Sequence, residues 1–238
     1  MESRARRLLA EFLGTVLLAA VVVGSGIAAQ TLSPGQAGLE LAENAIATAL
    51  GLGVIILMLA PISGAHLNPV ISLVDSLLGR RSWVDAATYI PVQVIGCIVG
   101  AVIANVMFGH AGISISSTDR SSPGHFLGEV VATAGLVLVV FLLARQGQEH
   151  LAPVAVGAYI GAAYFFTSST SFANPAITIG RIFTNSFAGI APTSVLAFIG
   201  AQLIGGAIGY AIVRLLTVRP AVAKLEGPNA GPTTSSGR

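Results

Sequence analysis

The sequence predicts an all-α membrane protein with six transmembrane helices and two re-entrant half-helices, arranged as two inverted repeats of three helices each. Three observations predict this fold class. The composition is too apolar for a water-soluble domain, six apolar runs have the length of a membrane span, and an internal similarity places an Asn-Pro pair in each half of the chain.

The composition excludes an ordinary water-soluble domain. Of the 238 residues, 54% are hydrophobic and only 9% are charged, whereas soluble domains carry about 25% charged residues. Apolar runs of roughly 17 to 25 residues cross a ~30 Å hydrocarbon core as helices. The sequence therefore predicts a six-helix bundle in the bilayer, with helices near residues 8–29, 44–62, 86–107, 126–144, 151–167 and 192–217.

The first apolar run has two interpretations. Three arginines precede it and "GIAAQ" closes it, as in a cleaved signal peptide. However, Glu11 lies inside the run, the run is long for a signal core, and it has a counterpart in the second half of the chain. These features favour a first membrane helix.

Positive charges predict the orientation in the membrane, because cytoplasmic flanks are enriched in Lys and Arg. With a cytoplasmic N-terminus, ten of the twelve Lys and Arg residues fall inside, and only Arg120 and Arg181 fall outside. We therefore expect a multi-pass protein of the plasma (inner) membrane with both termini in the cytoplasm. The net charge of +2 reflects this orientation and does not indicate nucleic-acid binding.

The chain divides into a transmembrane domain and a tail. The domain is expected over residues 1–220, with repeat one near 8–107 and repeat two near 126–217. Residues 221–238 are rich in Pro, Gly, Ser and Thr and lack an apolar face, which is typical of a disordered extension, here cytoplasmic. Since Cys97 is the only cysteine, no intrachain disulfide forms.

Two copies of one plan make up the domain. "AEFLGTVLL" matches "GEVVATAGLVL" through Glu11 and Glu129, and "QVIGCIVG" matches "QLIGGAIG" near the end of each half. Asn68 and Asn174 occupy matching places between them. Because each copy contains an odd number of spans, the second enters the membrane from the opposite side, and the repeats are inverted.

The two Asn-Pro loops predict re-entrant half-helices. The segments "HLNPVISLVDSLL" and "FANPAITIGRIF" are too short to span the bilayer, and Asn followed by Pro suits a helix start, where Asn caps and Pro occupies the first turn. Irregular backbone at membrane depth is tolerated only where protein buries it or where it lines a water-filled cavity. A central aqueous path follows.

Glu11 and Glu129 are expected to face the interior of the bundle, because a carboxylate facing lipid is costly. There they would accept hydrogen bonds from the non-helical backbone of the loops. Structural bracing is the favoured interpretation, and a proton relay is the alternative.

The sequence resembles the aquaporin and glycerol-facilitator family, also called the major intrinsic protein family. The resemblance lies in the two Asn-Pro-(Ala/Val) loops in inverted halves, in the Glu-containing helix that opens each half, and in the stretch "SGAHLNPV" of the first half. The resemblance covers about residues 8–217. It implies the aquaporin-like fold, a homotetramer with one pore per subunit, and a channel with no catalytic residues and no cofactor. The implied midplane residues of the pore are Asn68, Pro69, Val70, Asn174, Pro175 and Ala176.

Two residues of the first motif have alternative interpretations. Val70 stands where the family usually has Ala, and it either reshapes the midplane or adjusts the packing against a neighbouring helix. His66 resembles the family's His at the cytoplasmic side of the pore, which favours pore lining over simple packing.

The residue after the second motif departs from the family pattern. Most members have Arg directly after the second Asn-Pro-Ala, at the outer constriction, and here that position is Ile177. Its replacement removes a charge, hydrogen-bond donors and a polar wall, so we expect a wider and less polar mouth. The expected outer constriction consists of Thr48, Ala162 (Gly161 if the register shifts by one), Ser171 and Ile177.

Arg181 lies four residues beyond Ile177, one helical turn along the same half-helix. It is interpreted either as a surface arginine at the extracellular rim or as a residue that restores some charge at the pore.

These features resemble a bacterial branch of the family that lacks the constriction arginine and is associated with metalloid handling. The resemblance implies passive passage of small uncharged solutes, namely glycerol-like polyols, neutral arsenite, methylated arsenicals and water. The alternatives are a water-selective aquaporin and a proton-coupled secondary transporter, since inverted repeats with broken helices also build transporters. The four His residues are scattered, so we expect no metal site.

Overall fold

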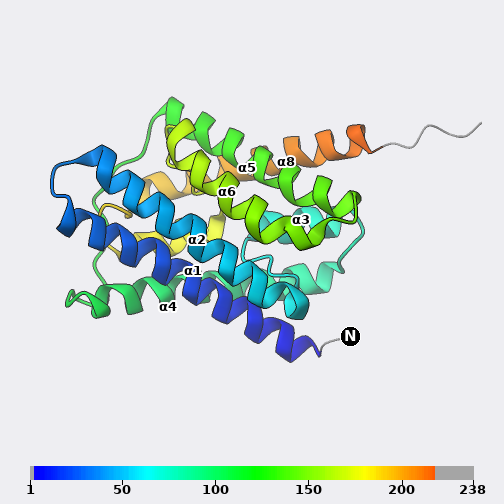
Figure 1. The fold of residues 1–238 in the computed structure, drawn as a ribbon, viewed down its shortest axis with the longest axis horizontal. Helices are drawn as coiled ribbons and strands as arrows, with labels where there is room; N and C mark the ends of the chain where they lie inside the picture. Colours follow the sequence, from blue (N-terminus) through cyan, green and yellow to red (C-terminus); the bar gives the residue numbers. More distant parts are fainter. Residues whose placement is uncertain (1–2, 218–238) are drawn as a thin grey trace, which may run out of the picture.

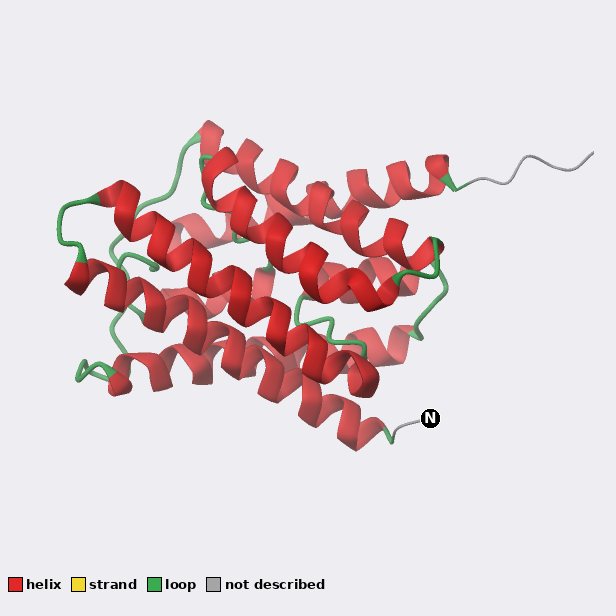
Figure 2. Ribbon diagram, in the orientation of Figure 1, coloured by secondary structure: helices red, strands yellow, loops and turns green. Residues whose placement is uncertain are grey.

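The structure, a computed structural model, describes residues 3–217. The tail expected over residues 221–238 lies outside this range, as does the predicted domain end at residue 220. The described part of the chain consists of helices and loops without strands (Figure 2). Its elements are α1 (Arg4–Leu32), α2 (Ala37–Ser63), α3 (Pro69–Leu77), α4 (Trp83–Met107), α5 (Pro123–Arg145), η1 (Glu149–Leu151), α6 (Ala152–Phe166), α7 (Pro175–Gly180), η2 (Arg181–Phe183) and α8 (Pro192–Leu216).

Most helix boundaries follow from local capping chemistry. Ser3, Ser82 and Ser122 precede α1, α4 and α5, and each serine side chain accepts a hydrogen bond from a backbone N–H in the first turn. Helix α2 ends at Gly64, which adopts a left-handed conformation with φ of 92°. The chain can therefore turn sharply into the first Asn-Pro loop.

Five of the described helices are long and apolar enough to cross a membrane, namely α1, α2, α4, α5 and α8. The sixth expected span, near residues 151–167, is shorter than the other five. It consists of a 3-residue 3₁₀ turn followed by the 15-residue helix α6, which at ~1.5 Å per residue rises only about 22 Å. It ends where Thr167 becomes extended and its hydroxyl returns to the Ala163 carbonyl at 2.7 Å.

The two halves of the bundle repeat the same packing. Helix α1 packs against α2 and α4, as α5 packs against α6 and α8, and contacts between α2 and α6 join the halves (Figure 1). Each half-helix contacts both halves, since α3 touches α4 and α8, and α7 does the same. The predicted fold class is confirmed, and the two half-helices lie between the two three-helix sets.

Small residues allow the closest helix contacts at equivalent places in the two repeats. A Cβ atom on Gly100 in α4 would lie 2.2 Å from the Val16 carbonyl oxygen of α1, and one on Gly209 in α8 would lie 2.7 Å from Val137 Cβ of α5. Only glycine fits at such distances. This is the way in which helices approach each other in lipid.

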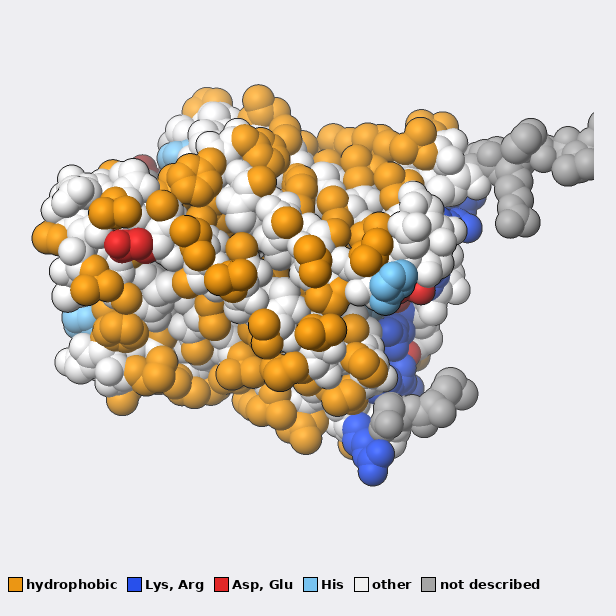
Figure 3. All heavy atoms as spheres, in the orientation of Figure 1, with side chains coloured by type: hydrophobic (Ala, Val, Ile, Leu, Met, Phe, Trp, Pro, Cys, Tyr) orange, Lys and Arg blue, Asp and Glu red, His pale blue; other side chains and the backbone are white. Residues whose placement is uncertain are grey.

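The outer surface of the bundle is apolar around its middle. Large side chains such as Leu50, Leu196 and Leu215 are 68%, 82% and 75% exposed, and Figure 3 shows hydrophobic side chains over the visible face. Lys and Arg side chains gather at the end where the N-terminus lies (Figure 3). Such a surface suits hydrocarbon rather than water around the middle of the molecule.

Candidate functional site

The half-helices α3 and α7 begin at Asn68 and Asn174, which cap them. Oδ1 of Asn68 accepts a hydrogen bond from the Val70 N–H at 2.9 Å, and Oδ1 of Asn174 accepts from the N–H groups of Ala176 and Ile177 at 2.9 and 3.3 Å. The proline that follows each asparagine has no N–H to satisfy. Each asparagine therefore satisfies first-turn N–H groups of its own half-helix.

The second polar atom of each asparagine binds the opposite loop. Nδ2 of Asn68 donates to the Ala173 carbonyl at 2.7 Å, and Nδ2 of Asn174 donates to the Leu67 carbonyl at 2.8 Å. The two loops, 105 and 107 residues apart in these pairs, thus hold each other at the centre of the bundle. The reciprocal pair reproduces the pseudo-twofold symmetry of the fold.

Glu11 supports the first loop. Its Oε1 accepts from the Ser63 hydroxyl at 2.7 Å and from the His66 N–H at 3.0 Å. Its Oε2 accepts from the Leu67 N–H and from Nε2 of Gln93, both at 2.8 Å. The carboxylate is fully buried, and each of its two oxygens accepts two hydrogen bonds, as a buried charge requires.

Glu129 does the same for the second loop. It accepts from the backbone N–H groups of Phe172 and Ala173, each at 2.8 Å, and from Nε2 of Gln202 at 2.6 Å. It is also fully buried. The equivalence of Glu11 and Glu129, expected from the repeat, is therefore an equivalence of hydrogen bonding.

These braces hold a backbone that is otherwise unfavourable. Ala65 and Leu67 before the first half-helix, and Ser171 and Ala173 before the second, have φ values of 45°, 53°, 52° and 48°. Residues other than glycine rarely adopt this left-handed region, and each costs of order 1–3 kcal/mol. These left-handed residues, with Thr170 at φ of 62° beside Ser171, keep the chain out of a helix, so that its carbonyl and amide groups stay available at the centre.

A single cavity of about 320 Å³ follows the two loops. At one end, which we call the inner mouth, Asp75, Arg80, Arg81 and Glu149 line it, and Asn68 and Asn174 line its middle. At the other end, which we call the outer mouth after the constriction expected there, the lining residues include Thr48, Tyr164, Ser171, Ile177 and Arg181.

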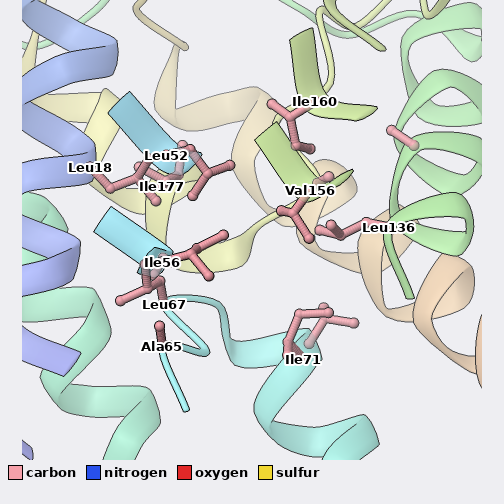
Figure 4. Packing of buried hydrophobic residues seen from close by; sticks show 14 of the residues in the cluster. Leu18, Leu52, Ile56, Ala65, Leu67, Ile71, Leu136, Val156, Ile160 and Ile177 are labelled. Atoms are coloured by element: carbon pink, nitrogen blue, oxygen red, sulfur yellow. The ribbon is translucent and has the colours of Figure 1, made fainter. Parts of the chain in front are cut away.

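The wall of the cavity that faces away from the loops is hydrophobic. Side chains from α1, α2, α5 and α6 lie around it in Figure 4, and they belong to the largest buried apolar cluster of the described residues. The core of the bundle is therefore also the lining of its cavity. The labelled side chains that line the cavity include Leu18, Leu52, Ile56, Leu136, Val156 and Ile160.

The family model for the major intrinsic protein matches residues 1–173, most of the chain. The chain belongs to the major intrinsic protein family. Members of this family are channels, not enzymes. The match ends directly before Asn174, the start of the second half-helix.

Two curated relatives of this major intrinsic protein cover most of its length. Aquaglyceroporin AqpS of Rhizobium meliloti is 44% identical over 229 residues, which are 95% of this chain and 97% of the relative. The glycerol uptake facilitator protein of Bacillus subtilis is 32% identical over 194 residues, 74% of this chain and 70% of the relative.

A solved structure has the same fold. The aquaglyceroporin from Plasmodium falciparum superposes with a TM-score of 0.67 at 22% sequence identity, over 90% of this chain and 95% of that chain. At this identity the likeness supports the fold of the major intrinsic protein and not its solute.

Of the six expected midplane residues, only the two asparagines line the cavity of this major intrinsic protein. Val70 is 2% exposed and packs towards α8, where a Cβ on Gly206 would lie 2.5 Å from Val70 Cγ1. Its contacts therefore favour a role in packing against a neighbouring helix over one in reshaping the midplane of the pore. The residues that lie behind the cavity wall are Pro69, Val70, Pro175 and Ala176.

Ala162 was expected at the outer constriction, and this prediction is wrong. Ala162 is exposed on α6, and Gly161 faces α2, where an added Cβ would lie 2.9 Å from Ala49 Cβ. Tyr164 lines the outer mouth instead. Two residues along a helix correspond to a rotation of about 200°, so Ala162 and Tyr164 lie on nearly opposite faces.

The other residues expected at the outer constriction do line the cavity. The Thr48 hydroxyl lies 3.1 Å from the Tyr164 hydroxyl. The Ser171 hydroxyl is buried and has no hydrogen-bond partner among the described residues. Ile177 is 4% exposed and adds an apolar surface. The outer mouth thus combines hydroxyl groups with a branched aliphatic side chain.

Arg181 is only 2% exposed and lines the cavity, so it is not a surface residue of the rim. Its Nε donates to the Ala188 carbonyl. Its guanidinium carbon lies 3.4 Å from the centroid of the Phe172 ring.

A second arginine approaches the same ring from the loop before α5. The guanidinium carbon of Arg120 lies 5.1 Å from the Phe172 centroid, and its nitrogens donate to the carbonyls of Gly189 and Phe187 at 2.9 and 3.1 Å. Burial lowers the pKa of Arg120 from its ordinary value. Arg120 does not line the cavity, and its contacts secure the loop that follows η2.

His66 lines the cavity towards the inner mouth. Its Nδ1 lies 3.0 Å from the Ser72 hydroxyl, and its Nε2 lies 3.2 Å from Oδ2 of Asp75. Asp75 also pairs with Arg80, whose Nε lies 3.0 Å from Oδ1. Sequence reasoning missed Asp75, although an acidic residue within a half-helix, five residues before a pair of arginines, is a signal for an ion cluster at a pore mouth.

Proposed function

We propose that this major intrinsic protein is a passive channel for small uncharged solutes, namely glycerol-like polyols, neutral arsenite as As(OH)₃, methylated arsenicals and water. One observation carries the proposal. The cavity that follows the two half-helices is lined at its outer mouth by Ile177, at the position where the family resemblance implies an arginine, and by the hydroxyl groups of Thr48 and Tyr164. The names of the relatives, an aquaglyceroporin and a glycerol uptake facilitator, support polyols.

The chemistry of the outer mouth suits a solute with both polar and apolar faces. Hydroxyls on Thr48, Tyr164 and Ser171 exchange hydrogen bonds with the oxygens of a polyol or of As(OH)₃, while Ile177 contacts its carbon or arsenic side. Water alone would gain little from the apolar wall. This composition favours the solute channel over the water-selective alternative.

The buried carboxylates argue against proton-coupled transport. Glu11 and Glu129 accept hydrogen bonds from loop donors and do not line the cavity. A relay group needs contact with the aqueous path to exchange protons. The geometry therefore supports flow driven by solute gradients alone.

We further propose that the channel lies in the plasma membrane with both termini in the cytoplasm and assembles as a homotetramer. The gathering of Lys and Arg at the end near the N-terminus (Figure 3) supports the orientation, because basic residues stay on the cytoplasmic side during insertion. The tetramer is implied by the family resemblance.

The first test is solute flux in proteoliposomes. Vesicles containing the channel and protein-free vesicles are exposed to gradients of glycerol, urea and neutral arsenite, and the volume change or uptake is followed in a stopped-flow instrument. We expect faster equilibration of each solute than in protein-free vesicles. Equal rates for every solute, with correctly inserted protein, would reject the channel.

The second test replaces Ile177. The variant Ile177→Arg places a charge and a larger side chain at the outer mouth, so glycerol and arsenite flux should fall about tenfold, equivalent to about 1.4 kcal/mol of barrier, while water flux stays measurable. Ile177→Leu, equal in volume and uncharged, is the matched control. An unchanged ratio of glycerol to water flux in Ile177→Arg would show that the constriction lies elsewhere.

A further inference from the structure

At the outer mouth, Ile177 stands where the family resemblance implies an arginine. A guanidinium from one helical turn further along, that of Arg181, lines the same cavity. Arg181 begins η2, directly after the half-helix α7, and its side chain lines the same cavity as Ile177. We propose that Arg181 is the specificity-determining residue of the outer mouth, where it excludes cations and donates hydrogen bonds to the oxygens of neutral solutes. This inference rests on the proposed channel function.

Arg181 has no counter-charge among the described residues. Arg7 and Arg80 form ion pairs with Asp85 and Asp75 at 3.0 Å, and both lie at the basic end of the bundle. Arg181 is far more buried than either, yet within residues 3–217 it forms no ion pair. A buried and uncompensated charge is costly, and at membrane depth such a residue faces a polar path and marks its function.

Arg181 also keeps part of its hydrogen-bond donors free of partners among the described residues. Its Nε is occupied by the Ala188 carbonyl, and its own carbonyl accepts from the Ile190 N–H at 3.3 Å. Among the described residues, the bond to Ala188 is the one hydrogen bond of the Arg181 side chain, and its two terminal nitrogens take no part in it. These nitrogens carry most of the N–H groups of a guanidinium, so a solute in the cavity is the acceptor that remains.

The Phe172 ring and the Ala188 carbonyl orient the Arg181 guanidinium. A guanidinium carbon 3.4 Å from the Phe172 centroid is in stacking contact with the ring, and stacking leaves the N–H groups free at the edges of the guanidinium plane. Together with the bond to Ala188, the stack fixes the side chain. A fixed donor discriminates between solutes better than a mobile one, because no ordering cost arises when the solute arrives.

The chemistry that such a mouth recognises is a neutral polyhydroxyl solute. One hydroxyl oxygen accepts from Arg181, another exchanges hydrogen bonds with Ser171, whose hydroxyl lacks a partner, and the apolar side of the solute faces Ile177. A cation of similar size loses water at the same point and meets a positive charge. Exclusion at the outer mouth then adds to that at the midplane.

The test compares two arginines that share one aromatic ring. Arg181→Met removes the charge at similar length, Arg181→Lys keeps it, and Arg120→Met removes the neighbouring guanidinium that does not line the cavity. Proteoliposomes are assayed for glycerol flux and for proton and methylammonium entry under a potassium diffusion potential. We expect about a tenfold or greater rise in cation entry for Arg181→Met only, with Arg181→Lys and Arg120→Met close to the unmodified channel.

A relocation variant extends the test. The double variant Ile177→Arg with Arg181→Met places the positive charge at position 177, one helical turn before its original position. Cation entry should then fall back to the level of the unmodified channel. Should Arg181→Met fail to fold, Arg181→Gln, which retains a donor for the Ala188 carbonyl, gives the same comparison. Melting temperatures of all variants are measured alongside.

Two results would overturn the proposal. In the first, the Arg181→Met or Arg181→Gln channel conducts glycerol and remains as impermeable to protons and methylammonium as the unmodified channel. The other is Arg120→Met that admits cations equally, which would show that the loop and not the charge at the mouth excludes them. Neither result resembles failure of the proposed function, in which the unmodified channel itself conducts no glycerol.

Discussion

At the scale of single residues, the two buried glutamates explain why the loops keep an unfavourable backbone. Each carboxylate pairs with two N–H groups that directly precede an asparagine cap, His66 and Leu67 in one repeat, Phe172 and Ala173 in the other. Each also binds a glutamine from a long helix. The left-handed residues and the carboxylate therefore depend on each other.

Removing one carboxylate should expose this dependence. Glu129→Ala leaves the N–H groups of Phe172 and Ala173 buried without an acceptor, which costs about 1–3 kcal/mol for each group. We expect a lower melting temperature in detergent and loss of glycerol flux, and a smaller effect for Glu129→Gln, which retains an acceptor oxygen.

The conservative variant also distinguishes the brace from a relay. As a brace, Glu129→Gln lowers stability, and the flux per folded channel stays the same from pH 5 to pH 8. Loss of flux with an unchanged melting temperature would favour a proton relay instead.

The residues that local rules govern were predictable, and those that depend on tertiary rotation were not. The positions of Asn68 and Asn174 at helix starts follow from capping chemistry and from the repeat. Tyr164 could not be chosen over Ala162, because an offset of two residues along α6 depends on how that helix rotates against α2. The hydroxyl pair that settles this joins residues 116 positions apart.

At the scale of elements, the contact between α3 and α8 accounts for the unusual valine of the first motif. Val70 fills the space that Gly206 leaves open. In the second repeat the residue after Asn-Pro is Ala176, and the residue equivalent to Gly206 is Cys97. In one pair the larger residue, Val70, lies in the half-helix and the smaller one in the long helix. In the other pair the larger residue, Cys97, lies in the long helix, so that the combined volume of the two residues stays similar.

A double-mutant cycle tests this packing. Gly206→Ala brings a Cβ to 2.5 Å from Val70 Cγ1, so it should destabilise the channel by about 1–3 kcal/mol. Adding Val70→Ala should recover most of that loss.

The same helix offers a control. Gly200 also lies in α8, and an added Cβ there meets nothing within 4 Å, so Gly200→Ala should be neutral or slightly stabilising. If Val70→Ala and Gly206→Ala lowered the melting temperature additively, the two residues would not be coupled.

At the scale of the whole molecule, composition and repeat symmetry were sufficient to predict the fold. Five spans have the expected length. The sixth, α6, ends at Phe166, within one residue of the end of the apolar run near 151–167, and its 15 residues make it shorter than the other five. The sequence could not predict which apolar residues line the path. Ile56 and Val156 belong to the buried apolar core and also line the cavity, and apolar character alone does not distinguish these two roles.

The reciprocal asparagine bonds predict a long-range effect. Asn68→Asp keeps the cap for Val70 but removes the amide that donates to the Ala173 carbonyl. We expect faster hydrogen exchange in the second loop, measured by mass spectrometry on peptides covering residues 168–178.

The control is Ser76→Ala, which lies in the same half-helix and whose hydroxyl bonds the Ser72 carbonyl at 3.1 Å within that helix. It should leave exchange in the second loop unchanged. Equal protection of the second loop in Asn68→Asp would mean that the two loops are held independently.

The same bonds constrain how the protein is made. While the ribosome is still translating, the Leu67 carbonyl waits for an amide that is 107 residues away, and the Asn68 amide waits for the Ala173 carbonyl. The first three-helix half can enter the membrane before that time, with Glu11 already paired to its loop, but these two groups at the centre have no partner until the second half has followed. The passage is therefore completed in one late step of biogenesis, and a nascent chain that stops before Asn174 has inserted helices but no finished opening.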